Sequence, residues 1–262
     1  KIRDVKYMYA TFLYQQFGEQ TMAQYGGYVD EADSGEESSK ESTGIFALDT
    51  LAEDETIARL ANGIKRFKLP EDANFIKLFM DIEQWRQLGQ IFENRRQYDR
   101  AVEFYRKAGD KVREKQILGN WGTLEGGTIQ AAGEPAKVSF RFRNGSKVEF
   151  VARKVKIEKL LKDTVSYVKS RPKMVEWDKT NLGDIGYRLV TQNEKRYLGE
   201  EAARWTTKLE PRPKHYDRRI EVTTPLDKPG VYLLEATMQG GNTTRVMVWV
   251  EDDGPGLPVS HT

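Results

Sequence analysis

The sequence predicts an α+β protein with two domains: an all-α helical domain over residues 1–120 and an antiparallel β-sandwich over residues 121–252. Before residue 118, apolar side chains recur every three to five positions, which is typical of amphipathic helices. After Gly119 they alternate with polar side chains or form short runs bounded by Gly, Pro and Asn, which is typical of strands. Helices do not alternate with the expected strands, and this favours a sandwich over a parallel sheet.

The composition of the chain limits the functions that it can perform. Its 262 residues include 42 basic and 40 acidic side chains, and the net charge of +2 does not predict binding to nucleic acid or to anionic lipid. The lack of cysteine excludes disulfides, thiol nucleophiles and cysteine-ligated zinc. No apolar run reaches the length of about 20 residues that a membrane span needs. The chain begins with Lys1 and ends in a stretch rich in Gly and Pro, 253–262, which we interpret as a linker, so we expect a piece of a longer polypeptide.

The first half predicts helices separated by one acidic loop. Apolar residues over 5–17 follow a helical period that no Pro or Gly interrupts. Residues 28–44 contain many acidic and serine side chains and almost no apolar ones, so we expect a mobile loop. Its carboxylates lack the spacing of an EF-hand calcium loop. Further helices are expected over 48–64, ending before Pro70, and over 75–82.

The clearest helical pattern lies between residues 85 and 108. Its spacing predicts two antiparallel helices, in which Gly89 and Ala101 allow a close approach while bulky side chains fill the seam. The pattern consists of Trp85, Leu88, Gly89 and Phe92, followed by Tyr98, Ala101, Tyr105 and Ala108. This spacing resembles the tetratricopeptide repeat, although Arg113 stands where a proline usually follows. One repeat alone is not stable, so residues 1–79 are expected to supply neighbouring helices.

The second half predicts seven or eight short strands and one inserted helix. The first strand is expected over 123–130. Residues 136–143 alternate clearly between apolar and polar, and Asn144-Gly145 predicts a type I′ hairpin that leads into a partner strand over 146–155. A helix is expected over 156–170, because apolar residues recur there at helical spacing until a proline. Additional strands are expected at 185–192, 202–209 and 218–224.

Two final strands close the expected sandwich. After a turn at 225–230, residues 231–238 form a continuous apolar run that is typical of a strand buried on both faces. We expect a closing hairpin between this strand and the one before the turn. A second turn leads to residues 243–250, where Val246, Val248 and Val250 share one face and Met247 and Trp249 share the other.

The chain contains no recognisable catalytic or cofactor-binding motif. A phosphate-binding loop, a dinucleotide fingerprint, a metalloprotease motif and a hydrolase nucleophile elbow are all missing from the sequence. Of the two histidines, His261 lies in the terminal tail, and we interpret His215 as a hydrogen-bonded loop residue rather than a catalytic base. We therefore expect no enzymatic activity, no metal site and no cofactor. We interpret the charged side chains of Lys137, Arg141 and Arg143 as the solvent-exposed face of a half-buried sheet.

Three segments of the chain resemble the α2-macroglobulin family. They are Thr-Thr-Pro-Leu-x-Lys-Pro-Gly-Val-Tyr-Leu-Leu-Glu-Ala (223–236), Ile-Gly-Tyr-Arg-Leu-Val (185–190) and Lys-His-Tyr-Asp-Arg-Arg (214–219). Some large bacterial members carry tetratricopeptide helices before their first macroglobulin domains, so the resemblance covers about residues 80–252 and implies a macroglobulin-type β-sandwich. It also implies an extracytoplasmic location, in the periplasm or at the cell surface. The thioester and the bait segment of that family are not carried over, because the chain has no Cys and no candidate bait.

The resemblance implies a non-catalytic structural and protein-interaction portion of a protease-trapping inhibitor. Its partners would be other domains of the same polypeptide and, through the parent molecule, proteases, with no nucleic acid. An alternative is a tetratricopeptide adaptor that binds peptides in a groove. By similarity to such repeats, the residues facing that groove are Glu83, Arg86, Gln90, Glu93 and Asn94. A third hypothesis is glycan binding through Trp177 or Trp205, for which core packing is the simpler interpretation.

Overall fold

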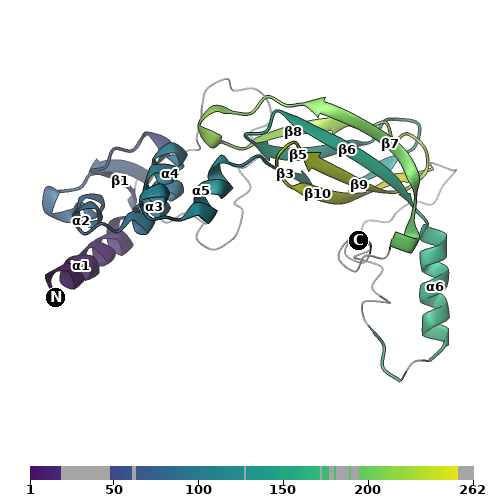
Figure 1. Ribbon diagram of the computed structural model, residues 1–262, viewed down its shortest axis with the longest axis horizontal. Helices are drawn as coiled ribbons and strands as arrows, with labels where there is room; N and C mark the ends of the chain where they lie inside the picture. Colours follow the sequence, from purple (N-terminus) through teal and green to yellow (C-terminus); the bar gives the residue numbers. More distant parts are fainter. Residues whose placement is uncertain are drawn as a thin grey trace. The chain divides into compact units, whose positions relative to one another are not determined.

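The computed structural model describes residues 1–18, 48–60, 63–126, 128–171, 173–176, 180, 189 and 195–252 (Figure 1). The chain divides into two compact units, Lys1–Leu118 and Gly119–Thr262, and each is described by itself. The expected loop at 28–44, the expected linker at 253–262, Trp177 and most of the expected strand at 185–192 lie outside the described residues. The assignment of these units as separate domains stays a prediction.

The first unit combines five α-helices with one β-hairpin among its described residues. Its elements are α1 (Ile2–Phe17), η2 (Leu48–Thr50), β1 (Glu55–Leu60), β2 (Gly63–Lys68), η3 (Glu71–Ala73), α2 (Phe75–Asp81), α3 (Trp85–Asn94), α4 (Tyr98–Lys107) and α5 (Lys111–Leu118). One apolar cluster, contributed mainly by α1 to α4, forms the core of this unit. The helices expected at 5–17 and 75–82 are therefore present as α1 and α2.

The helix expected over 48–64 is wrong, and with it the all-α description of the first half. Strands β1 and β2 pair antiparallel instead, with Glu55 opposite Lys68 and Leu60 opposite Gly63. In the sequence, Asn62-Gly63 is a strong hairpin dipeptide, which the helical interpretation overlooked. Tertiary contacts also hold this segment out of a helix, as described next.

The side chain of Arg95 is fully buried and fastens the turn that leads into β1. Its Nη1 donates to the carbonyl oxygen of Ala52 and its Nη2 donates to that of Glu55, both at 2.8 Å. Gln97 Nε2 donates to the carbonyl oxygen of Leu51 at 2.7 Å. These carbonyls would accept intrahelical hydrogen bonds if the segment were a helix, so the buried guanidinium favours the non-helical backbone.

Helices α3 and α4 form an antiparallel pair with a tightly packed seam. A Cβ built on Gly89 would lie 2.6 Å from the ring of Tyr105, so only glycine fits at this crossing. Phe92 and Phe104 stack at a centroid distance of 5.1 Å, and Ala101 is fully buried. The pair therefore has the close approach that the sequence spacing predicted, while its assignment to the tetratricopeptide class stays a prediction.

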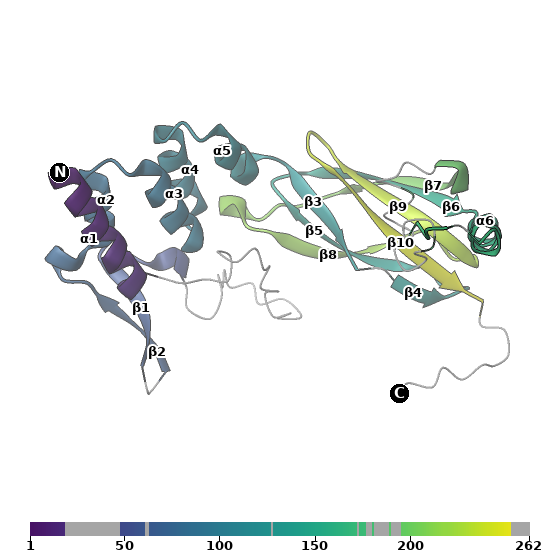
Figure 2. The same ribbon diagram turned by 90° about the horizontal axis from the view of Figure 1, so that it is seen from below.

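The second unit is a β-sandwich with one helix. Its described elements are β3 (Trp121–Glu125), β4 (Thr128–Ala131), β5 (Lys137–Arg143), β6 (Lys147–Val155), α6 (Ile157–Lys169), η4 (Lys195–Tyr197), β7 (Leu198–Lys208), η5 (Pro213–His215), β8 (Arg218–Thr223), β9 (Gly230–Met238) and β10 (Thr243–Glu251). They form a five-stranded sheet of order β4-β10-β9-β6-β7 and a three-stranded sheet of order β3-β5-β8 (Figure 2). The inserted helix is confirmed.

The core of the sandwich lies between the two sheets. The inward residues of β5, namely Val138, Phe140 and Phe142, pack against the inward residues of β6, β9 and β10. On β10, Val248 and Val250 face this core, whereas Met247 and Trp249 pack against a second cluster on the outer face of the five-stranded sheet. The expected two-sided burial is confirmed over 231–234, whereas Glu235 and Thr237 are partly exposed on the outer face. The two faces of 243–250 are confirmed.

Three pairing expectations differ from the structure. Strands β5 and β6 lie in different sheets, so Asn144-Gly145 is a crossover between sheets rather than a type I′ hairpin, and of the two residues only Asn144 has a positive φ, 60°. Strands β8 and β9 also lie in different sheets, so no closing hairpin joins them. Finally, β4 pairs with β10 in parallel, and the sandwich is therefore not purely antiparallel.

The crossover at Asn144-Gly145 meets two other segments around Met238. A Cβ on Gly122 would lie 3.0 Å from Met238 Cγ, and one on Gly145 would overlap Met238 Cε. A Cβ on Gly241 would lie 2.9 Å from Met238 Cβ and would overlap the carbonyl oxygen of Asn120. We call this meeting point the Met238 corner, defined by Gly122, Gly145, Met238 and Gly241.

Asparagine side chains fasten the Met238 corner. Asn242 donates through Nδ2 to the carbonyl oxygen of Gly122 at 2.8 Å and accepts from the N–H of Gly122 at 2.9 Å. Asn120 Nδ2 donates to the carbonyl oxygen of Gln239 at 2.7 Å. These amides supply the hydrogen bonds of backbone groups that no neighbouring strand reaches.

Replacing Gly89 with alanine is expected to destabilise the first unit by about 1 kcal/mol, the middle of the net range of the two effects that follow. Alanine gains about 1 kcal/mol in helix propensity, but overpacking against the held ring of Tyr105 costs about 1–3 kcal/mol. Urea unfolding followed by circular dichroism measures the change. Gln90→Ala, an exposed position in the same helix, serves as the control, and a Gly89→Ala variant as stable as this control would contradict the close packing.

Gly241→Ala is expected to destabilise the sandwich more than Gly145→Ala. The new methyl group at position 241 meets the backbone of Asn120, which cannot move away, whereas at position 145 it meets the flexible end of Met238. We expect a loss of about 2–3 kcal/mol for the first variant and about 1 kcal/mol for the second. Thermal unfolding of the two variants gives the order, and the reverse order would show that side-chain crowding controls the corner.

Candidate functional site

The five residues predicted to face a peptide groove lie in α3 and just before it, and four of them contact other parts of the helical unit. Arg86 reaches Asp110 just before α5, with Nη2 and Oδ2 3.0 Å apart. Asn94 donates through Nδ2 to the hydroxyl of Tyr14 in α1 at 3.1 Å, so it points to a different helix. Glu83 lies 3.8 Å from Arg3.

Gln90 and Glu93 differ in their exposure to solvent. Gln90 is exposed on α3, whereas Glu93 is held inside the helical unit. Both carboxylate oxygens of Glu93 accept from Arg113 Nη2 at 2.7 Å, and Oε2 also accepts from the hydroxyl of Tyr105 at 2.6 Å. Burial, and then the hydrogen bond to Glu93, raises the pKa of the Tyr105 hydroxyl, which therefore remains a donor at neutral pH. The peptide groove stays a prediction, and the contacts of Glu93 are those of a packing residue.

His215 occupies a half-buried position in the turn η5. Its Nδ1 lies 2.8 Å from Oδ1 of Asn144, and its φ is 63°. The partner Asn144 in turn donates through Nδ2 to the carbonyl oxygen of Gly119 at 3.0 Å. His215 is thus a hydrogen-bonded loop residue, as interpreted from the sequence, and it supports the crossover between β5 and β6.

The tryptophans of the sandwich take part in packing. Trp205 on β7 stacks on Phe150 with ring centroids 5.0 Å apart, and it borders the core between the sheets. The guanidinium of Arg141 lies 5.5 Å from the ring centroid of Trp121, a cation–π arrangement. Stacking on Phe150 covers one face of the Trp205 ring, and glycan binding stays a prediction.

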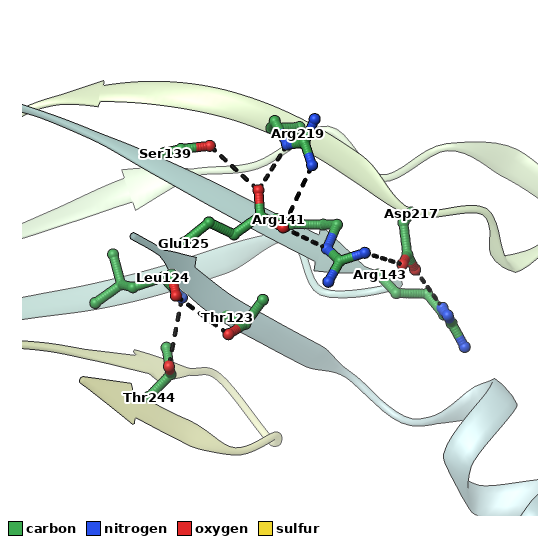
Figure 3. A network of polar contacts seen from close by, with 9 residues as sticks. All are labelled: Thr123, Leu124, Glu125, Ser139, Arg141, Arg143, Asp217, Arg219 and Thr244. Atoms are coloured by element: carbon green, nitrogen blue, oxygen red, sulfur yellow. Dashed lines mark hydrogen bonds and ion pairs between the residues drawn. The ribbon is translucent and has the colours of Figure 1, made fainter. Parts of the chain in front are cut away.

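The most extensive polar network in the second unit lies on the outer face of the three-stranded sheet (Figure 3). It runs as an alternating chain of charges from Arg219 to Glu125, Arg141, Asp217 and Arg143. We call this group the arginine–carboxylate face. It contains three positive and two negative side chains, so it carries a net positive charge.

Short contacts connect the members of this face. Glu125 lies 2.6 Å from Arg219 Nε and 2.8 Å from Arg141 Nε. Asp217 accepts from Arg143 Nε at 2.6 Å and lies 3.9 Å from Arg141 Nη1. Ser139 donates to Glu125 at 3.3 Å. Each carboxylate therefore bridges two guanidinium groups, and this fixes long side chains that would otherwise move freely.

The strand register explains why the arginines need these carboxylates. The alternation of β5 places Arg141 and Arg143 on the outer face, while Phe140 and Phe142 point into the core. Arg141 stands directly opposite Arg219 on β8, and like charges in such a pair repel. The carboxylate of Glu125 on β3 contacts both guanidinium groups, and its negative charge offsets their mutual repulsion.

The sequence pattern predicts the outward arginines of this network but not their acidic partners. The outward arginines of β5 follow from the alternating pattern, and they were interpreted as a wet sheet face. The acidic partners are distant in the sequence. Asp217 is 74 residues from Arg143, and Glu125 is 94 residues from Arg219. The sheet order β3-β5-β8 brings them together, and no local pattern specifies that order.

Among the described residues, no group of three or more His, Asp or Glu side chains is close enough to hold a metal ion. Within the same residues, each helix is too short or too polar to cross a membrane.

Comparison with known proteins gives only weak likenesses. No protein-family model matches the sequence, and no curated protein matches it. A structure of native α2-macroglobulin from Escherichia coli spanning domains MG0-NIE-MG1 covers 51% of this chain and 39% of its own, with a TM-score of 0.31 and 13% identity. A second structure, spanning NIE-MG1, covers 50% of this chain and 61% of its own, with a TM-score of 0.30 and 15% identity.

A third solved structure belongs to a different protein. The CARDB domain of PF1109 from Pyrococcus furiosus, in complex with di-metal ions, covers 50% of this chain and 86% of its own, with a TM-score of 0.24 and 10% identity. The chain thus spans less than two thirds of the α2-macroglobulin fragments that it resembles. Similarities at this level establish neither a family nor an activity.

Glu125→Gln is expected to destabilise the second unit by about 1 kcal/mol, because it leaves Arg141 and Arg219 facing each other without a charge between them. Urea unfolding at low and high salt measures the effect, which should shrink as salt screens the repulsion. Lys137→Ala, which breaks the exposed pair with Glu221 on the same sheet, should change stability by less than about 0.5 kcal/mol. Equal effects of the two variants would contradict a coupled network.

Proposed function

We propose that this chain is a non-catalytic structural and protein-interaction portion of an α2-macroglobulin-like protease-trapping inhibitor. The proposal rests on the resemblance of segment 223–236 to the family. It implies that the chain acts by presenting a stable surface to other domains of the parent polypeptide, and that it works outside the cytoplasm. The observation that supports it most directly is the arginine–carboxylate face, whose side chains are already ordered by one another.

The segment that carries the resemblance has an architectural role. Leu226 inserts into the core between the sheets, and its carbonyl oxygen accepts from the N–H of Ala136 at 2.9 Å. The N–H of Thr224 donates to the carbonyl oxygen of Ala136 at 2.8 Å. Tyr232 donates through its hydroxyl to the carbonyl oxygen of Lys228 at 2.9 Å. The motif residues thus position the crossover from β8 to β9, which is a role in scaffolding rather than in chemistry.

The arginine–carboxylate face is suited to bind a carboxylate-rich protein surface. Its guanidinium groups are held in fixed orientations, so little side-chain entropy is lost when a partner docks. Arg219 is its most exposed member, with 35% of the side chain accessible, compared with 19% for Arg141. A partner carboxylate would therefore meet Arg219 first, and it could form a bidentate pair there.

The first test of this proposal uses a protease. The full chain is incubated with trypsin, and cleavage of a small chromogenic peptide and of casein is followed. Both rates are expected to stay unchanged, and no conjugate should appear on a denaturing gel, since the chain has no cysteine to form a thioester. Inhibition or conjugation by this chain alone would overturn the scaffold role.

The second test addresses the surface. The remaining domains of the parent polypeptide, supplied as a separate protein, are titrated with the chain by calorimetry. Arg219→Ala is expected to weaken binding by about ten-fold, the loss of one charge-assisted pair. Lys137→Ala, a control on the same sheet, is expected to bind as the unsubstituted chain does. No measurable binding, or equal losses for both variants, would contradict this use of the face.

A further inference from the structure

Helix α6 leaves part of its apolar surface uncovered. Leu160 is fully buried and Thr164 nearly so, and they attach the helix to the sandwich. Next to this attached strip, Leu161, Val165 and Val168 are exposed by 41%, 49% and 54%. Their spacing of four and three residues places them in one stripe along the helix.

The continuation of the chain after the helix exposes two further apolar residues. Tyr167 holds this continuation, because its hydroxyl accepts from the N–H of Glu176 at 2.9 Å and donates to the carbonyl oxygen of Met174 at 3.4 Å. Met174 and Val175 are exposed by 83% and 59%. We call Leu161, Val165, Val168, Met174 and Val175 the α6 apolar stripe.

The orientation of the stripe is fixed by contacts on the other side of α6. Leu160 packs in the cluster that contains Val155, Tyr197 and Leu233 on the outer face of the five-stranded sheet. The hydroxyl of Tyr197 donates to Oδ2 of Asp163 at 2.9 Å. One of the acidic groups of the helix is thus turned toward the sandwich, while the stripe faces solvent.

Basic side chains surround the stripe. Residues 156–176 contain six basic and three acidic side chains, a net charge of +3, although the entire chain carries only +2. The six are exposed, and they are Lys156, Lys159, Lys162, Lys169, Arg171 and Lys173. The positive charge of the protein is therefore concentrated here, which the bulk composition concealed.

Helix α1 also exposes apolar residues, but its charges are arranged differently. Arg3 lies 3.8 Å from Glu83, and Lys6 lies 3.8 Å from Asp81. Within the described residues, the six basic side chains around the α6 apolar stripe form no such ion pairs. Among the described residues, α6 thus combines an uncovered apolar stripe with basic side chains that form no ion pairs, whereas both basic side chains of α1 lie near acidic partners.

We propose that α6 and residues 173–176 dock on the surface of an anionic lipid bilayer. A helix with an apolar stripe and a lysine-rich polar side lies in the interface between headgroups and acyl chains. The stripe would enter this interface, and the lysines would extend their aliphatic stems along it and place their ammonium groups among lipid phosphates. A bilayer surface satisfies both features together, because its anionic headgroups lie directly above its apolar interior.

The experiment measures binding of the full chain to lipid vesicles by co-sedimentation. Vesicles of phosphatidylcholine containing about one third phosphatidylglycerol are compared with vesicles of pure phosphatidylcholine. The chain is expected to bind the anionic vesicles at least about ten-fold more strongly, and less strongly as salt increases.

Two double variants locate the binding surface. Leu161→Ser with Val165→Ser removes the centre of the stripe, and Lys162→Glu with Lys169→Glu reverses two flanking charges. Each is expected to lower vesicle binding by about ten-fold or more. Because all four side chains are exposed, the circular dichroism spectrum and thermal unfolding should not change.

Matched controls change the same residue types elsewhere. Val112→Ser removes an exposed apolar residue of α5, and Lys115→Glu with Lys208→Glu reverses two exposed lysines outside the segment. These controls should bind vesicles as the unsubstituted chain does.

The proposal is overturned if the chain does not bind anionic vesicles, if it binds neutral ones equally well, or if the control variants lose as much binding as the α6 variants. It is also overturned if the α6 variants bind vesicles normally but abolish self-association in analytical ultracentrifugation. That result would assign the stripe to a contact between protein chains. None of these results bears on the trypsin assay or on Arg219→Ala, so the proposed scaffold function is tested separately.

Discussion

The lack of space around Met238 constrains the entire sandwich. The entry into β3, the crossover from β5 to β6 and the turn between β9 and β10 all approach this side chain, and each does so at a glycine. The backbone of Gly122 and the turn between β9 and β10 are joined at this point by side-chain hydrogen bonds, which the amides of Asn120 and Asn242 supply. Because the corner includes segments of both sheets, it sets the position of one sheet on the other at this end.

In the first unit, the buried guanidinium of Arg95 likewise supplies hydrogen bonds to irregular backbone. Arg95 is completely covered, and the desolvation of its guanidinium is offset by the carbonyl oxygens of Ala52 and Glu55. The arginine joins the turn after α3 to the segment before β1, which are about 40 residues apart in the chain. Both units thus rely on side-chain amide or guanidinium donors, rather than on ladders, at the places where irregular backbone is buried.

Local periodicity predicted most of the elements and few of their partners. Helices α1, α3, α4 and α6 and the strands β5, β9 and β10 follow from apolar spacing, as does the fit of Gly89 against Tyr105. The hairpin β1–β2 was missed because Ile57, Leu60 and Ile64 fit a helical period as well as a strand. Sheet membership was mistaken at Asn144-Gly145 because the crowding by Met238, 94 positions later in the chain, is invisible locally. For the same reason the arginines of the arginine–carboxylate face were recognised, while Glu125 and Asp217 were not.

The parallel pairing of β4 with β10 has a consequence for synthesis of the protein. Strand β4 is made early in the second unit, but its neighbour β10 is the last strand, so β4 acquires its pairing partner only at the end of synthesis. Contacts of such long sequence separation form slowly. A ribosome must release β10 before the five-stranded sheet has its β4 edge, and until then the backbone of β4 has no strand to pair with.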